Sequence, residues 1–310
     1  MRLVALILIS VFVAACGSDA ASAPQPVTVA LDFTPNPVHA PIYEAAKAPS
    51  HGVRIQIRKP GSGPDSLKLV ASGKVDLGVL DIHDLAIARE QGVDLVAVGA
   101  LVGKPLAALV AQPGVPRPRA LEGRTVGVSG LPSDPAFLKA IVSHDGGDVT
   151  KVKQVTIGFA AVNRLLTKRV DAVPAFWNAE GVALQKAGLD VKEFRVEDYG
   201  APPYPEVVLM TSRRTLAEHG ERVKNALAAI ADGLTATREH PADAVSIIAR
   251  AAETKDTALV RAQLDAVLPV FAPGLKLDRG VLEQWADFDA RIGLVKKRPD
   301  VGQAFDFTLR

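Results

Sequence analysis

The chain has 310 residues, a length that suits two lobes of about 100–150 residues each. With 48% hydrophobic and 23% charged residues it can build substantial cores, which excludes a chain that is disordered throughout. Its 36 basic and 34 acidic residues give a net charge of +2, which is too balanced for a nucleic-acid scaffold.

The single cysteine excludes further kinds of site. Cys16 has no second cysteine with which to form an internal disulfide, and no group of cysteines and histidines has the spacing of a zinc site. We therefore expect no bound metal ion and no cofactor.

The N-terminal sequence is typical of an export signal. Arg2 precedes an apolar stretch at residues 3–15, which is too short to span a membrane permanently. The stretch ends in Val-Ala-Ala-Cys at residues 13–16, which resembles the bacterial lipobox. The resemblance implies a signal peptide at residues 1–15, a lipid anchor on Cys16, a tether at residues 16–26 and a location outside the cytoplasmic membrane. An ordinary signal peptide with an incidental cysteine is the alternative.

From residue 27 the sequence alternates strands with helices. Period-two alternation or a continuous apolar run predicts strands at residues 27–31, 53–57, 75–80 and 95–101. Helices are predicted at residues 41–47, 65–72 and 81–91. The first range begins with a proline and the second with an aspartate that could cap the helix. Pro35 and Pro37 end the first strand and force a loop.

The same plan begins again at residue 124. Strands are predicted at residues 125–128, 152–157 and 170–176, with helices at residues 136–143 and 160–168. The sequence GKVDLGV at residues 73–79 is echoed by KRVDAV at residues 168–173. Beyond residue 213 the pattern becomes helical, with helices predicted at residues 221–238, 241–252, 255–267 and 278–292.

This alternation predicts an α/β protein of two lobes, each containing a doubly wound parallel sheet, with a cleft between them. We assign residues 27–112 and 214–310 to the first lobe and residues 113–213 to the second. The C-terminal helices are expected to pack back onto the first lobe, so that two or more crossovers connect the lobes.

Ligands of open parallel sheets bind outside the carboxyl ends of the strands. That rule selects residues 32–39, 80–83, 129–134 and 176–180, and residues 198–204 are added because they carry two of the three tyrosines. From these segments and the helix after the first, the candidate ligand contacts are Asp32, Phe33, Asn36, His39, Tyr43, Asp81, Ser129, Pro132, Ser133, Phe176, Trp177, Asn178, Glu180, Tyr199 and Tyr204.

These residue types favour a flat polar ring as the ligand. Aromatic side chains could stack on the face of the ring, and the carboxylate of Glu180 or Asp32 could accept hydrogens from an amidine-like edge. The alternative roles are structural: Trp177 could pack in a core, an acidic residue could cap a helix, and His39 could be satisfied within its own loop.

Several of these segments resemble one family. Residues 31–43, 73–78, 123–128, 177–181 and 198–206 are similar to the NMT1/THI5-like group of ABC-transporter solute-binding proteins, over about residues 27–240 in order. The resemblance implies a two-lobed periplasmic-binding-protein type II fold and a thiamine pyrimidine precursor as ligand, such as formylaminopyrimidine or hydroxymethylpyrimidine. It also implies a membrane permease as partner, and we expect a monomer. Phe33 stands where the family often has tryptophan.

Two other functions stay open. Fungal relatives synthesise the pyrimidine from pyridoxal phosphate and a protein histidine, but their lysine and histidine align with Leu80 and Asp84, and their cysteine-rich run is absent here. Other related proteins bind alkanesulfonates, taurine or nitrate, and Ser129 and Ser133 could serve such an anion. The nearby carboxylates would repel it. A binding protein, not an enzyme, is therefore expected, and a structural lipoprotein is the remaining alternative.

Overall fold

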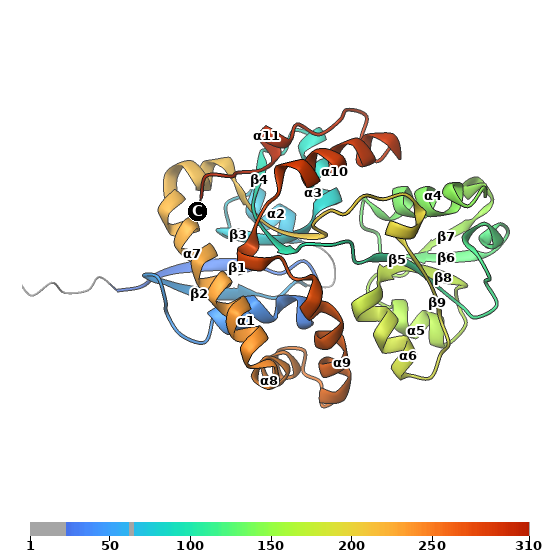
Figure 1. Ribbon diagram of the computed structural model, residues 1–310, viewed down its shortest axis with the longest axis horizontal. Coiled ribbons are helices and arrows are strands. Elements are labelled where there is room, and N and C mark those ends of the chain that lie inside the picture. Colours follow the sequence, from blue (N-terminus) through green and yellow to red (C-terminus); the bar gives the residue numbers. More distant parts are fainter. Residues whose placement is uncertain (1–22, 62–64, 310) are drawn as a thin grey trace, which may run out of the picture.

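The computed structural model describes residues 23–61 and 65–309. The predicted signal peptide, the lipid-modified Cys16 and most of the tether lie outside these residues. Within them the chain forms two lobes that lie side by side, with the C-terminal helices gathered on the first (Figure 1). In the described part of the chain, no helix combines the length and the apolar character that crossing a membrane requires.

The first lobe contains a mixed sheet in the order β2-β1-β3-β10-β4. β1 pairs parallel with β2 and β3, whereas β10 runs antiparallel between β3 and β4. The strands are β1 (Gln25–Ala30), β2 (Val53–Arg58), β3 (Leu77–Asp81), β4 (Leu95–Val102) and β10 (Val207–Ser212).

The second lobe repeats this arrangement in the order β7-β6-β8-β5-β9. Here β6 pairs parallel with β7 and β8, and β5 runs antiparallel between β8 and β9. The strands are β5 (Ala107–Ala111), β6 (Thr125–Val128), β7 (Lys153–Thr156), β8 (Ala172–Phe176) and β9 (Lys192–Arg195). The two-lobed α/β architecture predicted from the repeated plan is confirmed.

The chain changes lobes earlier than expected at both crossings. β5 pairs in the second sheet and β10 in the first, although residues 107–111 and 207–212 were assigned to the opposite lobes. Both segments are short apolar runs buried throughout, and no sequence pattern indicates which sheet such a run will join. Each sheet therefore contains one antiparallel strand that the alternation of strands and helices did not predict.

Helices cover both faces of the sheets. Those inserted between the strands are α1 (Ala40–Ala45), α2 (Ser66–Ala71), α3 (Ile82–Glu90), α4 (Asp134–His144), α5 (Ala161–Leu166) and α6 (Val182–Lys186). The C-terminal helices are α7 (Arg213–Glu239), α8 (Pro241–Ala251), α9 (Thr257–Val267), α10 (Arg279–Arg291) and α11 (Val301–Ala304).

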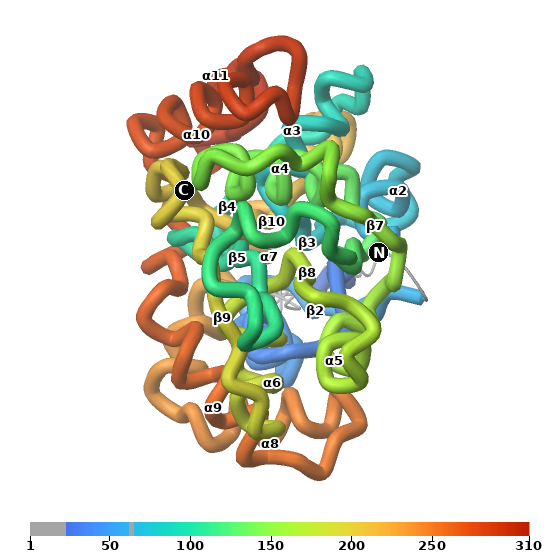
Figure 2. The backbone as a smooth tube through the Cα atoms, turned by 90° about the vertical axis from the view of Figure 1, so that its right-hand side faces the viewer, coloured from blue at the N-terminus to red at the C-terminus, as the bar shows by residue number. Residues whose placement is uncertain are grey.

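The C-terminal helices pack mainly on the first lobe, as expected. α7 contacts α1, β1 and β2, and α11 contacts α3 and β4. α9 also reaches the second lobe, where it contacts α6. Seen from the side of the second lobe, α10 and α11 lie above the sheets and α8 and α9 lie below them (Figure 2).

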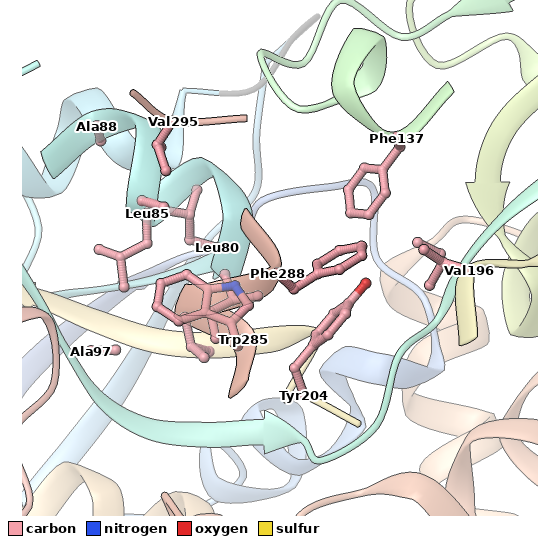
Figure 3. Packing of buried hydrophobic residues seen from close by; sticks show 14 of the residues in the cluster. Leu80, Leu85, Ala88, Ala97, Phe137, Val196, Tyr204, Trp285, Phe288 and Val295 are labelled. Carbon is pink, nitrogen blue, oxygen red and sulfur yellow. The ribbon is translucent and has the colours of Figure 1, made fainter. Parts of the chain in front are cut away.

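One hydrophobic core is shared by the two lobes. It joins Leu80 and Trp285 of the first lobe to Leu109 and Phe137 of the second. In Figure 3, Phe137 of α4 and Phe288 of α10 lie close to Tyr204 of the returning crossover. The lobes are thus packed together on this side, and a cavity opens beside the shared core.

Candidate functional site

A cavity of about 320 Å³ lies between the lobes, and both of them line it. Ten of the predicted contact residues are in its wall: Asp32, Phe33, Asn36, His39, Asp81, Ser129, Pro132, Ser133, Phe176 and Glu180. The volume is at the lower end of the range that small-molecule sites occupy, so it suits a single ring with small substituents.

The topology explains why these residues meet. Asp32 follows β1, Asp81 ends β3, Ser129 follows β6 and Phe176 ends β8. In each sheet these strands run parallel to one another, so their carboxyl ends lie at one edge. The two edges face each other across the cavity.

In the first lobe, a histidine in the loop after β1 holds Asp32. His39 Nε2 lies 2.8 Å from Asp32 Oδ1, while His39 Nδ1 accepts the backbone N–H of Asn36 at 3.2 Å. The acceptor role of Nδ1 places the proton of a neutral ring on Nε2, which donates to Asp32. Asn36 itself caps the short helix Pro37–His39 by accepting from Val38 N. His39 and Asn36 therefore orient the carboxylate.

A second acidic group lies where β3 meets α3. Asp81 caps α3 by accepting the N–H of His83 at 2.7 Å. Burial, together with the charges of Glu206 and Asp84, raises the pKa of Asp81 well above its ordinary value. Burial also raises the pKa of Asp84 to about 7. Asp84 hydrogen-bonds with Ser133 of the second lobe, so this contact bridges the cavity wall.

In the loop after β6, Asp134 accepts the hydrogen bonds that a bound anion would need. Asp134 Oδ2 accepts from Ser129 Oγ at 2.8 Å and from Gly130 N at 3.0 Å. Gly130 has φ +95°, a conformation that side chains other than glycine rarely adopt. Burial raises the pKa of Asp134. Because Asp134 takes these donors, the loop is poorly suited to hold a sulfonate or nitrate.

Glu180 is the acidic residue of the second lobe's wall. It belongs to a single π-helical turn, η4 (Trp177–Gly181), and its Oε2 accepts the N–H of Phe176 at 3.1 Å. Burial raises the pKa of Glu180. In its protonated form this carboxyl group can both donate and accept a hydrogen bond, whereas the ionised form can only accept.

The structure does not bring five of the predicted residues to the cavity wall. Trp177 donates from Nε1 to Pro105 O at 3.2 Å, and its ring packs against the Arg195 guanidinium, 4.2 Å from the ring centroid. Asn178 is fully buried within the π-helical turn. The other three are the tyrosines Tyr43, Tyr199 and Tyr204.

All three tyrosines pack against protein groups. Burial raises the pKa of Tyr43 to about 12. The ring of Tyr199 meets His144 edge-on with the centroids 5.8 Å apart, and that of Tyr204 meets His83 in the same way at 4.6 Å. The scarcity of aromatic residues in the sequence suggested ligand contact, but these rings fill cores.

Several residues of the cavity wall were not predicted from the sequence. Phe159 follows the carboxyl end of β7, outside the predicted segments, and its ring centroid lies 4.2 Å from that of Phe33 across the cavity. The strand-end rule would have found it. Asp134 lies in the predicted segment 129–134 but was not among the candidate contacts, whereas Phe137, Asp84 and Lys68 lie on helices that only the tertiary structure brings to the cavity.

The raised pKa of Glu180 has a measurable consequence. A carboxyl group with a folded-state pKa above its ordinary 4.5 binds more protons in the folded than in the unfolded state. Its contribution to the free energy of unfolding is therefore complete below pH 4.5 and is lost as the pH rises through the raised value. We expect the free energy of unfolding of the wild type, relative to that of Glu180→Gln, to fall as the pH rises from 4 to 8. Urea unfolding at each pH measures this difference. A difference that is constant from pH 4 to pH 8 would contradict it.

Comparison with known proteins identifies the family of this chain. The sequence profile described as NMT1/THI5 like matches residues 36–244. A formylaminopyrimidine-binding protein of Halalkalibacterium halodurans is 31% identical over 256 residues, which cover 80% of this chain and 78% of that protein. The chain belongs to the NMT1/THI5-like family.

Matches of lower identity include proteins named for other activities. A 4-amino-5-hydroxymethyl-2-methylpyrimidine phosphate synthase of Uromyces fabae is 21% identical over 289 residues, covering 87% of this chain and 83% of the fungal protein. Among solved structures, the periplasmic aliphatic sulphonate binding protein of Escherichia coli superposes with a TM-score of 0.71 at 19% identity, covering 91% of this chain and 92% of that one. The predicted periplasmic-binding-protein fold is thereby confirmed.

Proposed function

We propose that this protein is the extracytoplasmic solute-binding component of an ABC importer and that it captures a thiamine pyrimidine precursor, formylaminopyrimidine or hydroxymethylpyrimidine. The observation that carries the proposal is the composition of the cavity between the lobes. Phenylalanine rings and buried carboxyl groups from both lobes surround a space of about 320 Å³. Rings can stack on an aromatic heterocycle, and a carboxyl group can pair with an amino group beside a ring nitrogen.

The charge of the wall favours a neutral or cationic ligand. Among the described wall residues, Asp32, Asp81, Asp84, Asp134 and Glu180 are acidic, whereas Lys68 is the only lysine or arginine. The likeness to a sulphonate-binding protein is one of fold and rests on 19% identity. The described wall residues offer an anionic ligand one cationic side chain, Lys68, and any acidic residue that is ionised would repel it, so the charge argues against such a ligand.

In this proposal the two lobes close around the bound ligand. Phe33 and Ser133 come from opposite lobes and make contacts across the cavity, with Phe159 and Asp84 respectively. A ligand that contacts both walls favours the form in which the walls are close, and only this difference in affinity can shift the equilibrium. The closed lobes would dock on a membrane permease, with the monomer held at the membrane by the lipid on Cys16.

Binding without turnover is the activity we propose. The similarity to the formylaminopyrimidine-binding protein, at 31% identity, exceeds that to the fungal synthase, at 21%. Leu80 and Asp84 stand where we align the lysine and histidine of the fungal enzymes, so this chain offers no lysine there to form a Schiff base.

Isothermal titration calorimetry of the purified chain tests the proposal. We expect micromolar or tighter binding of formylaminopyrimidine or hydroxymethylpyrimidine, and no measurable heat with taurine, an alkanesulfonate or nitrate. The mixture is then analysed by chromatography, and the pyrimidine should be recovered unchanged. Binding of sulfonates alone would overturn the pyrimidine assignment, and turnover of the pyrimidine would overturn the assignment as a binding protein.

A further inference from the structure

Three metal-ligating side chains meet beside the cavity although they are far apart in the sequence. Asp81 and His83 lie where β3 passes into α3, and Glu206 precedes β10. One carboxylate oxygen of each acidic residue and one ring nitrogen of His83 all lie within 4.8 Å of one another. Asp81 is 8% exposed, and His83 and Glu206 are fully buried. When its carboxyl groups are ionised, a buried cluster of this kind needs a counter-charge.

Protein groups already hold one side-chain atom of each of these three residues in place. His83 Nδ1 lies 2.6 Å from Asp289 Oδ1, and Glu206 Oε2 accepts the backbone N–H groups of Leu106 and Ala107. Asp81 Oδ1 accepts the N–H of His83. Metal-ligating histidines characteristically donate their second ring nitrogen to a carboxylate, as His83 does to Asp289.

Two other atoms of these side chains have no N–H or hydroxyl partner in the part of the chain that the structure describes. Among the described residues, none forms a hydrogen bond with His83 Nε2 and no N–H or hydroxyl group donates to Glu206 Oε1, although both atoms are buried. His39 differs from His83, because both ring nitrogens of His39 have hydrogen-bond partners in the protein. The carboxyl groups of Glu206 and Asp81 hydrogen-bond with each other, so they share a proton, and the unpartnered ring nitrogen of His83 belongs to the same buried cluster of described residues. A cation that displaced this proton could be held by all three side chains.

We propose that Asp81, His83 and Glu206 bind one Zn²⁺ ion. An imidazole and two carboxylates form a donor set that zinc accepts, whereas Mg²⁺ prefers oxygen ligands alone. Three protein ligands leave a fourth position for water or solute, and Asp81 is also part of the cavity wall. This site is independent of the identity of the pyrimidine ligand.

Such an ion would connect the first lobe to both crossovers. Glu206 lies on the returning crossover, and its other oxygen holds Leu106 and Ala107, where the outgoing chain enters β5. Around the cluster, the rings of Phe137 and Tyr204 each meet His83 edge-on with the centroids 4.6 Å apart. Figure 3 shows these two rings beside Phe288. This apolar surrounding strengthens electrostatic attraction between the ion and its ligands.

Titration of the chelator-treated full-length chain with ZnCl₂ tests the inference. We expect one Zn²⁺ per chain, a rise in the unfolding temperature on binding and no response to MgCl₂ at the same concentration. Glu206→Gln keeps an acceptor for Leu106 and Ala107 but loses a charged ligand, so its affinity should fall at least 10-fold. Asp289→Asn alters only the residue that positions His83 and should lower the affinity roughly 10-fold.

An exposed histidine–aspartate pair supplies the matched control. His51 Nε2 lies 2.6 Å from Asp232 Oδ2 on the surface, so His51→Gln should leave the zinc affinity unchanged. Co²⁺ in place of zinc should give a visible absorption band that Glu206→Gln abolishes. Absence of saturable one-to-one binding to the folded wild type would overturn the inference, as would an affinity that neither Glu206→Gln nor Asp289→Asn alters.

Discussion

Replacing Glu180 by alanine should weaken aminopyrimidine binding roughly 30-fold or more, equivalent to about 2 kcal/mol. The carboxyl group lies in the cavity wall, and burial raises its pKa. Truncation removes the partner of the amino group and leaves a polar edge of the ring unsatisfied in a largely desolvated site. Calorimetry at pH 7 measures the change in dissociation constant.

The glutamine variant distinguishes the protonation state in which Glu180 acts. A glutamine amide can donate to a ring nitrogen and accept from an amino group, as a protonated carboxyl group does. If Glu180 binds as the neutral acid, Glu180→Gln should retain much of the affinity that Glu180→Ala loses. Glu197→Ala is the control, since Glu197 is exposed and outside the cavity wall. An affinity for Glu180→Ala equal to that of the wild type would exclude Glu180 from ligand contact.

The sequence could predict those parts of the site that follow from strand polarity. Asp32 and Asp81 reach the cavity because each stands at the carboxyl end of a parallel strand, and strands can be recognised from local periodicity. The same rule applies to Phe159, which follows the carboxyl end of β7. Local sequence thus determines which loops point to the cavity.

The sequence could not predict which side chains in those loops face the ligand. Trp177 directly follows Phe176, yet only Phe176 lines the cavity, because the π-helical turn carries the indole toward Pro105 and Arg195. Irregular turns of this kind have no reliable sequence signature. β5 and β10 were missed for a related reason, since their pairing depends on contacts between distant segments.

The cluster of Asp81, His83 and Glu206 shows the same limit for metal sites. Sequence spacing detects ligands that lie on one loop or one helix, and it predicted no zinc site here. Glu206 is separated from the other two by most of the second lobe, and only the return of the chain through β10 places it beside them. Such sites become visible only when the topology is known.

The second large effect concerns the contact between α1 and α7. A Cβ atom on Gly233 would lie 2.1 Å from Pro41 O and 2.9 Å from Ala45 N, both backbone atoms of α1. Although alanine is the better helix former, Gly233→Ala should destabilise the protein by about 3 kcal/mol, because backbone atoms cannot move aside as a flexible side chain can. Urea unfolding followed by circular dichroism measures the loss.

Gly220, which lies beside the kink of α7 at His219, is the control for an uncrowded glycine. A Cβ atom there would meet nothing within 4 Å, so Gly220→Ala should change the free energy of unfolding by less than about 1 kcal/mol. Because α1 directly follows the segment Asn36–His39 that orients Asp32, a shift of α1 should also disturb the cavity. Gly233→Ala should therefore bind the pyrimidine more weakly even where it remains folded. Wild-type stability in Gly233→Ala would mean that α1 and α7 can separate freely, and the first lobe would then be a poor support for a rigid binding wall.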